Sequence, residues 1–538
     1  MQSNLTETQK DYAVFLPSIS GFYGTFIGKQ RFGEYVEPAR IPQGLGEMEA
    51  LNFLNPDKGA FNYKWALYSA GHAELDVNKH SEKEDMVRNR DRENTWLLGD
   101  SGGFQIAKGL WEGDWTDPDC PKAAKKRELV VNWMEEYMDY GMMLDIPTWT
   151  FQDPKAANAA NIHSYQDAVD ATHINAKYYM ANMRGNFKVL NVLQGSNHAD
   201  ADHWYNEFKD YSDPAKYPDT HFRGWAMGGQ NMCDVHLILR RLVHMIHDGL
   251  LEEGLHDVMH FLGTSKLEWA TLLTDIQRSV RKYHNKNFMI TYDCASPFLA
   301  TANGQIYHSI RIKDRGKWSY MMSPSIDDKK YSNDTRLFSE VFVERKTADA
   351  HKIAKNQAEL DHLIRKIAFE DSPISRHCLA KDICIYAPGD LNKIGKEGRT
   401  SWDSFSYALQ MGHNVWMHIE STQRANREYD AGKFPYMLID EKFERTTFRD
   451  VVDEVFGLKD KEKSLAKIEE YHRFWMQVIG TRLNIGKKAV NASTQFGNHF
   501  DVTAEIAPEV LSEEEAEQWI KKKKETFVPN LPDNLWDF

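Results

Sequence analysis

The sequence predicts an α/β fold, a (β/α)8 TIM-like barrel with an enlarged, mostly helical C-terminal region. Two observations predict this fold. Short apolar segments alternate with helical patterns along roughly the first 300 residues, and such alternation is typical of βα units with parallel strands. Eight such segments match the number of strands that closes a barrel, whose active site collects at the carboxyl ends of the strands.

The eight predicted strands are short and apolar, and most end at a glycine, a carboxylate or an amide. They are residues 14–17, 65–68, 96–99, 141–145, 187–194, 223–229, 258–263 and 288–293. Helical spacing of apolar residues predicts helices between them at 122–140, 175–183, 203–211, 235–247 and 267–280. Residues 21–62 are rich in Gly, Pro and aromatic residues and are predicted to be irregular.

Beyond the eighth strand the pattern changes, and we place a loose domain boundary near residue 345. Residues 1–345 form the predicted barrel domain, and 346–538 form the C-terminal region. The patterns in this part predict mixed strand and turn at 301–345, a charged amphipathic helix at 346–370, helices at 440–483 and a further helix from Ser512 to Lys524.

Composition and charge narrow the classes of protein. The chain has 538 residues and a formal net charge of −13, which argues against non-specific coating of nucleic acid. No segment approaches the roughly 18 apolar residues of a membrane span. Its start has no signal-peptide pattern, and five scattered cysteines favour a reducing compartment. We therefore expect a cytoplasmic location and no membrane partner, and we consider a homodimer.

Polar groups and glycines gather where the predicted strands end. A set of three carboxylates, one amide and bare backbone suits a flat, hydrogen-bonding ligand such as a nucleobase. The alternative is that each polar residue merely caps the helix that follows. The set comprises Asp100, Asp145, Gln194, Gly228, Gly229, Gly263 and Asp293.

Five motifs resemble those of the tRNA-guanine transglycosylases, in the same order and on the corresponding strands. The likeness covers about residues 10–300. The motifs are Asp100-Ser101-Gly102-Gly103-Phe104-Gln105, Leu193-Gln194-Gly195-Ser196, Met227-Gly228-Gly229, Phe261-Leu262-Gly263 and Tyr292-Asp293-Cys294.

The resemblance implies base exchange by double displacement. Asp293 would be the nucleophile that attacks the sugar C1′ and expels guanine, leaving a glycosyl-enzyme ester. A carboxylate suits this role because the transition state resembles an oxocarbenium ion. Asp100 would be the general acid and base for the leaving and incoming bases.

The resemblance also implies a base-binding set. Asp145 would accept hydrogen bonds from the purine N1–H and exocyclic amine, while Gln194 and the Gly229 backbone would bind the O6 side. Phe104 and Leu262 would sandwich the base. The set is completed by Ser101, Gly228 and Gly263.

The family's zinc motif is altered here. Cys378, Cys384 and His413 are the candidate zinc ligands, with His377 or His418 as a fourth. The alternative is two buried thiols and a surface histidine. No organic cofactor is expected.

Nucleic acid is the expected macromolecular substrate, and a 7-deazaguanine such as preQ0 is the expected second substrate. The altered cysteines and the enlarged C-terminal part are more similar to the DpdA-like branch, which favours DNA, with tRNA as the alternative. The expected phosphate contacts are Arg311, Lys313, Arg315 and Lys317, and a second basic cluster comprises Lys122, Lys125, Lys126 and Arg127.

Two further readings stay open at this point. A barrel glycosidase also uses two carboxylates, on a sugar substrate. A non-catalytic partner subunit is the other alternative, although retention of both Asp100 and Asp293 counts against it.

Overall fold

A computed structural model describes residues 3–30, 36–79, 85–385, 400–440 and 446–483. The helix predicted from Ser512 to Lys524 lies outside the described residues. Among the described helices, none combines the length and apolar character needed to cross a bilayer.

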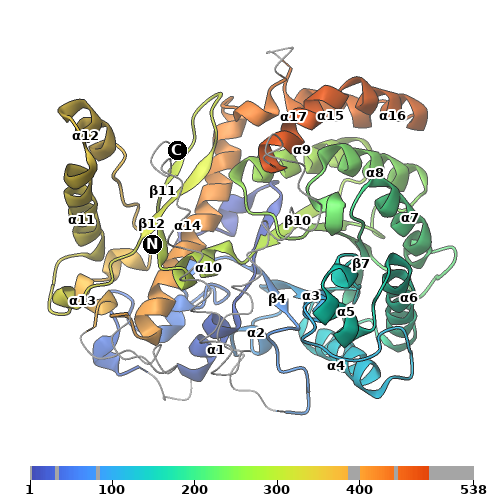
Figure 1. Ribbon diagram of the computed structural model, residues 1–538, viewed down its shortest axis with the longest axis horizontal. Helices are drawn as coiled ribbons and strands as arrows, with labels where there is room; N and C mark the ends of the chain where they lie inside the picture. The colour runs from blue at the N-terminus through green and yellow to red at the C-terminus, as the bar shows by residue number, and fades with distance from the viewer. Residues whose placement is uncertain (1–2, 31–35, 80–84, 386–399, 441–445, 484–538) are drawn as a thin grey trace.

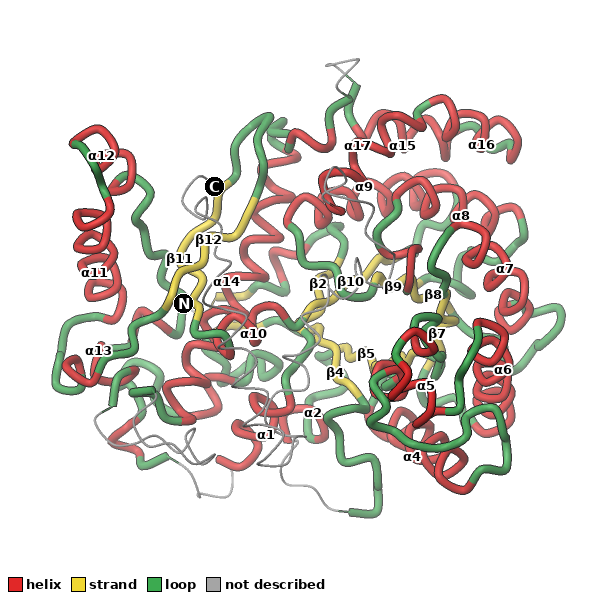
Figure 2. Tube along the Cα trace, viewed as in Figure 1, coloured by secondary structure: helices red, strands yellow, loops and turns green. Residues whose placement is uncertain are grey.

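Eight parallel strands form the barrel (Figures 1 and 2), which confirms the predicted fold class. The order is β2-β10-β9-β8-β7-β6-β5-β4, and a parallel bridge from Ser18 to Leu67 joins the two edge strands. The Ile19 amide also donates to the Leu67 carbonyl at 2.9 Å. The barrel strands are β2 (Val14–Pro17), β4 (Trp65–Ser69), β5 (Trp96–Asp100), β6 (Tyr140–Met142), β7 (Lys188–Leu193), β8 (Gly224–Met227), β9 (Val258–Phe261) and β10 (Met289–Cys294). The short strands β1 (Ser3–Asn4) and β3 (Phe61–Asn62) pair separately.

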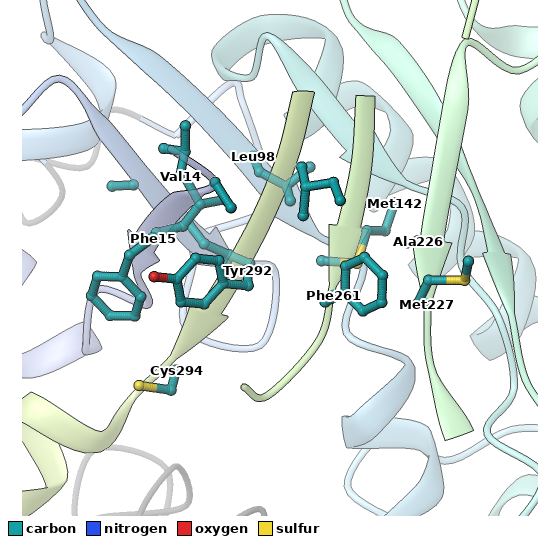
Figure 3. Packing of buried hydrophobic residues seen from close by; sticks show 14 of the residues in the cluster. Val14, Phe15, Leu98, Met142, Ala226, Met227, Phe261, Tyr292 and Cys294 are labelled. Atoms are coloured by element: carbon teal, nitrogen blue, oxygen red, sulfur yellow. The ribbon is translucent and has the colours of Figure 1, made fainter. Parts of the chain in front are cut away.

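The strands are almost wholly apolar because both of their faces are covered, by the barrel interior and by the helices. Figure 3 shows side chains of neighbouring strands packed together, with the Phe15 and Tyr292 rings 5.6 Å apart. The register pairs Asp100 with Ser69, at the ends of β5 and β4. It also pairs Asp293 with Leu16, near the end of β2. Both predicted catalytic carboxylates therefore lie at the carboxyl edge of the barrel.

The helices that follow the strands form an outer ring (Figure 1). Side chains cap several of them: Ser164 accepts from the Asp167 amide, and Asp234 accepts from the Leu237 amide. The helix predicted at 235–247 has those bounds. The helices are α1 (Gly21–Gln30), α2 (Asp85–Arg88), α3 (Gly103–Ala107), α4 (Pro121–Tyr137), α5 (Pro154–Ala160), α6 (Tyr165–Asn182), α7 (His198–Phe208), α8 (Val235–His247), α9 (Leu267–Tyr283) and α10 (Ser296–Ala302).

Helix α1 corrects the prediction that residues 21–62 are irregular. Its aromatic residues outweigh the poor helix propensity of its glycines because they are buried. Tyr23 and Phe26 are buried, and the Phe22 ring lies 5.0 Å from Tyr407, edge to face.

A helix of the C-terminal region closes the outer ring. Helix α14 (Ser404–Asp430) lies against α9 and α1, where the Tyr429 hydroxyl donates to Asp275 at 2.6 Å. Position 345 falls inside α11 (Phe338–Ile353). The barrel is thus completed from beyond the predicted boundary, and the division into two domains stays a prediction.

The rest of the C-terminal region is a hairpin and further helices. In Figure 1, α15 to α17 lie beside α8 and α9. The elements are β11 (Gln305–Arg311), β12 (Ser319–Pro324), α12 (Gln357–Ile364), α13 (Ala380–Ile383), α15 (Phe448–Gly457), α16 (Lys461–Glu470) and α17 (His472–Leu483).

Candidate active site

A cavity opens at the carboxyl ends of the barrel strands. It encloses about 750 Å³, a volume that includes the open space at its mouth. Nine of the ten residues predicted for catalysis and base binding line it: Asp100, Phe104, Asp145, Gln194, Gly228, Gly229, Leu262, Gly263 and Asp293.

The tenth predicted residue, Ser101, is buried beside the cavity and does not line it. Sequence reasoning missed the remaining lining residues, of which Trp149 is the largest. The others are Ser18, Leu67, Gly103, Met142, Pro147 and Met232.

Asp293 is held by one oxygen only. The Gly263 amide donates to Oδ1 at 2.9 Å, and His260 Nε2 lies 3.2 Å from the same atom. Within the described residues, Oδ2 receives no hydrogen bond from the protein. The carboxylate is therefore fixed through Oδ1, and Oδ2 is available to a ligand in the cavity.

His260 is fully buried behind Asp293, and its other ring nitrogen, Nδ1, lies 2.9 Å from the Thr291 hydroxyl. An ionised carboxylate only accepts hydrogen bonds, so Nε2 carries the proton that points to Asp293. The Thr291 hydroxyl holds the other side of the ring through Nδ1. The contacts from Thr291 to His260 and from His260 to Asp293 fix both the ring and the carboxylate.

Asp100 is placed by the turn that follows β5. Ser69 donates its hydroxyl to Oδ2 at 2.6 Å, and the Gly102 amide lies 3.4 Å from Oδ1. Burial raises the pKa of Asp100, and the negative charge of Asp293 raises it further. A carboxyl with a raised pKa holds its proton at higher pH, as a general acid requires.

The two glycines after Ser101 are required by this turn. Gly102 has φ +83°, a backbone conformation that side chains disfavour. A Cβ at Gly103 would lie 2.5 Å from the Asp145 carbonyl oxygen. The turn therefore brings the end of β5 against the loop that holds Asp145.

Asp145 and Gln194 form a buried pair. Strand β6 ends at Met142, earlier than predicted, and Asp145 lies in the loop beyond it. Gln194 Nε2 donates to Asp145 Oδ2 at 2.7 Å. Burial raises the pKa of Asp145 to about 7, and the charge of Asp100 adds to the rise. Within the described residues, the buried Gln194 Oε1 has no partner, so it is an acceptor for a ligand donor.

Aromatic side chains form one wall of the cavity. The Phe104 and Trp149 ring centroids lie 5.9 Å apart at 57°, and Lys108 Nζ lies 5.2 Å from the Trp149 ring. Leu262 lines the cavity with them. Such flat apolar surfaces suit stacking of a heterocyclic base.

The predicted zinc ligands do not form one site. Among the described residues they are not one of the groups whose ligand atoms lie within 4.8 Å of one another. Cys378 and Cys384 are buried and donate to the carbonyls of Ile374 and Ile326, each at 3.5 Å, and burial raises the pKa of both thiols. His413 Nε2 lies 2.7 Å from the Tyr307 carbonyl oxygen, so this histidine is buried rather than on the surface. The residues present do not fit a zinc ion there.

The predicted phosphate contacts lie on the β11–β12 hairpin. Lys313, Arg315 and Lys317 are exposed, and Arg311 is half-buried. The Trp318 amide donates to Glu268 Oε1 at 3.1 Å, in the first turn of α9. The tip of the hairpin contacts the segment that follows α14, where the Arg315 amide donates to the Phe434 carbonyl at 2.8 Å and the Tyr436 amide donates to the Gly316 carbonyl at 3.0 Å.

The second basic cluster is engaged within the protein. Lys122 and Lys125 pair with Glu112 and Glu128, each at 3.0 Å. Arg127 is buried and donates to Asn175 at 2.7 Å.

No family model matches this chain, and no curated protein matches it. Its function must be inferred from the site itself.

Proposed function

We propose that this chain is a pentosyltransferase that exchanges guanine in DNA for a 7-deazaguanine base such as preQ0, as its resemblance to the tRNA-guanine transglycosylases suggests. The observation that carries the proposal is the single cavity lined by nine of the ten expected residues. Those residues come from separate segments of the chain, so their meeting is not a consequence of any one motif.

The carboxylates support a two-step exchange. Asp293 Oδ2 attacks the sugar C1′ while Asp100 gives its proton to the leaving guanine. The C1′–N bond breaks and a C1′–O ester forms. The incoming base then gives a proton to Asp100 and attacks C1′, which releases Asp293.

The base-binding side supports a purine with donors on one edge. Asp145 and Gln194 Oε1 are acceptors, and they suit the N1–H and amine donors of a guanine-like base. The Gly229 amide is expected at the O6 side. This revises the role of Gln194, whose Nε2 is engaged with Asp145.

The departure from the family's zinc pattern supports the choice of DNA, and tRNA is the alternative substrate. The deciding experiment is mass spectrometry of nucleosides from DNA and from tRNA, after expression with a supply of 7-deazaguanine. We expect modified deoxyguanosine with the wild type and none with Asp293→Asn. Modification of tRNA alone would replace the DNA proposal, and modification of neither would refute the exchange activity.

A further inference from the structure

Five side chains of the types that bind metal ions gather at the start of α8, outside the cavity. Asp234 and His236 belong to that turn, His198 begins α7, and Glu469 and His472 flank the junction of α16 and α17. They form two groups, each with ligand atoms within 4.8 Å of one another, and His236 belongs to both.

We propose that His236, Glu469 and His472 bind one divalent transition-metal ion of the zinc class, which fastens α16 and α17 to α8. His236 Nε2 lies 2.8 Å from Glu469 Oε1. The His472 ring meets the His236 ring edge-on, with centroids 5.1 Å apart. A tetrahedral ion with bonds near 2.1 Å separates its ligand atoms by about 3.4 Å, so small side-chain shifts admit the ion.

The donor set selects the kind of metal. Two imidazoles and one carboxylate are a set that zinc uses, with a fourth position left to water. Calcium and magnesium prefer oxygen ligands alone.

The other group is already satisfied by the protein. Arg240 lies 3.1 Å from His198 Nδ1, and His198 Nε2 lies 2.7 Å from Asp234 Oδ2. Asp234 also caps α8 by accepting from the Leu237 amide at 3.1 Å. His198 is therefore engaged at both nitrogens, while the negative charge of Asp234 beside His236 favours a cation there.

The proposed ligands come from two parts of the chain, α8 and the junction of α16 and α17, which meet only through folding. Helices α16 and α17 pack on α8 (Figure 1), and Trp475 donates to the Ile468 carbonyl at 2.7 Å. Because Ile468 and Trp475 are fully buried, the two helices have an apolar contact of their own. The ion would add a cross-link to a junction that already forms, so loss of a ligand should not unfold the chain.

The test uses the full chain after treatment with a chelator. Cobalt(II), a spectroscopic substitute for zinc, is titrated while visible absorption is followed, and zinc affinity is then measured by competition. We expect one equivalent with the intense bands of a four-coordinate ion. His472→Ala and Glu469→Gln should each weaken binding by roughly tenfold or more.

Glu470→Gln and His198→Ala are the matched controls, because Glu470 is a neighbour outside the group and His198 belongs to the other group. Zinc should raise the melting temperature of the wild type and of both controls, but not that of His472→Ala. Equal weak binding by all variants would mean an adventitious ion only. If His198→Ala lost zinc binding while His472→Ala kept it, the ion would be bound by the His198 group instead. Either result would overturn the proposal. The metal-binding and melting measurements do not depend on base-exchange activity.

Discussion

His260 Nε2 lies 3.2 Å from Oδ1 of Asp293, the same oxygen that the Gly263 amide reaches at 2.9 Å. Two donors on one oxygen orient the carboxylate and leave the other oxygen to react. His260 does not touch the cavity, so it is a positioning residue. Its role resembles that of groups that hold a reacting atom in line with its target.

His260→Asn should lower kcat of base exchange by roughly 10- to 100-fold, because small displacements of a reacting atom have costs of that size. KM should change little, since the base-binding residues are untouched. His260→Gln, with an amide donor nearer the position of Nε2, should recover part of the rate. His256→Asn is the control, because His256 is also buried but binds the Ser212 carbonyl. An unchanged kcat in His260→Asn would remove the positioning role.

Asp100→Asn should slow exchange by about 10²- to 10⁴-fold, the usual effect of losing general acid–base catalysis. The asparagine amide at position 100 cannot give up a proton to the leaving guanine. Single-turnover kinetics with labelled guanine measure the step directly. Asp170→Asn, on the exposed face of α6, is the control. A rate within a few-fold of the wild type would assign proton transfer to another group.

Guanine binding should strengthen as pH rises through about 7, the value to which burial raises the pKa of Asp145. Below that pH the carboxyl is protonated and has lost acceptor capacity toward the purine N1–H and amine. The dissociation constant, measured by calorimetry from pH 5.5 to 8, should fall and then level off. Asp145→Asn should bind guanine more weakly, with a flat profile. A flat profile in the wild type would mean that Asp145 does not titrate in this range.

The ionised Asp145 carboxylate should lower the free energy of unfolding. The pKa of Asp145 in the folded state, about 7, lies above the ordinary aspartate value of 3.8, so the folded state binds more protons than the unfolded state between these pH values. The free energy of unfolding should therefore fall as pH rises from 4 to 7, by at most about 4 kcal/mol for three pKa units. Asp145→Asn should be more stable than the wild type at pH 8 and similar to it at pH 4. Chemical denaturation at the two pH values tests this, and equal stability at pH 8 would contradict it.

The strands and most of the cavity were predictable from local sequence. The apolar run Trp96–Leu98, followed by Gly99 and Asp100, predicts both a strand and a carboxylate at its carboxyl end. The carboxyl ends of parallel strands meet at one edge, so the position along each strand is enough to assemble the site.

Other features depend on contacts between distant segments. Asp293 and its partner His260 lie 33 residues apart, and His260 looks from sequence like one more residue of an apolar strand. Helix α14 completes the ring only because it packs on α1 and α9, which local periodicity does not encode. The spacing of Cys378 and Cys384 suggested zinc ligands, but spacing alone does not show that each thiol is buried against a different backbone carbonyl.

The β11–β12 hairpin should supply part of the attraction for DNA. A chain with a net charge of −13 must bind a polyanion through a local cationic surface, and the hairpin carries four basic residues between positions 311 and 317. Replacing Arg311, Lys313, Arg315 and Lys317 by Gln should weaken DNA binding equally for all sequences. Each lost phosphate contact should also reduce the slope of log K against log salt by about 0.9. Fluorescence anisotropy at several salt concentrations measures both, with Lys122→Gln/Lys125→Gln on α4 as the control. Unchanged affinity and slope would place the DNA path on another face, since phosphate contacts cannot be lost without a change in salt dependence.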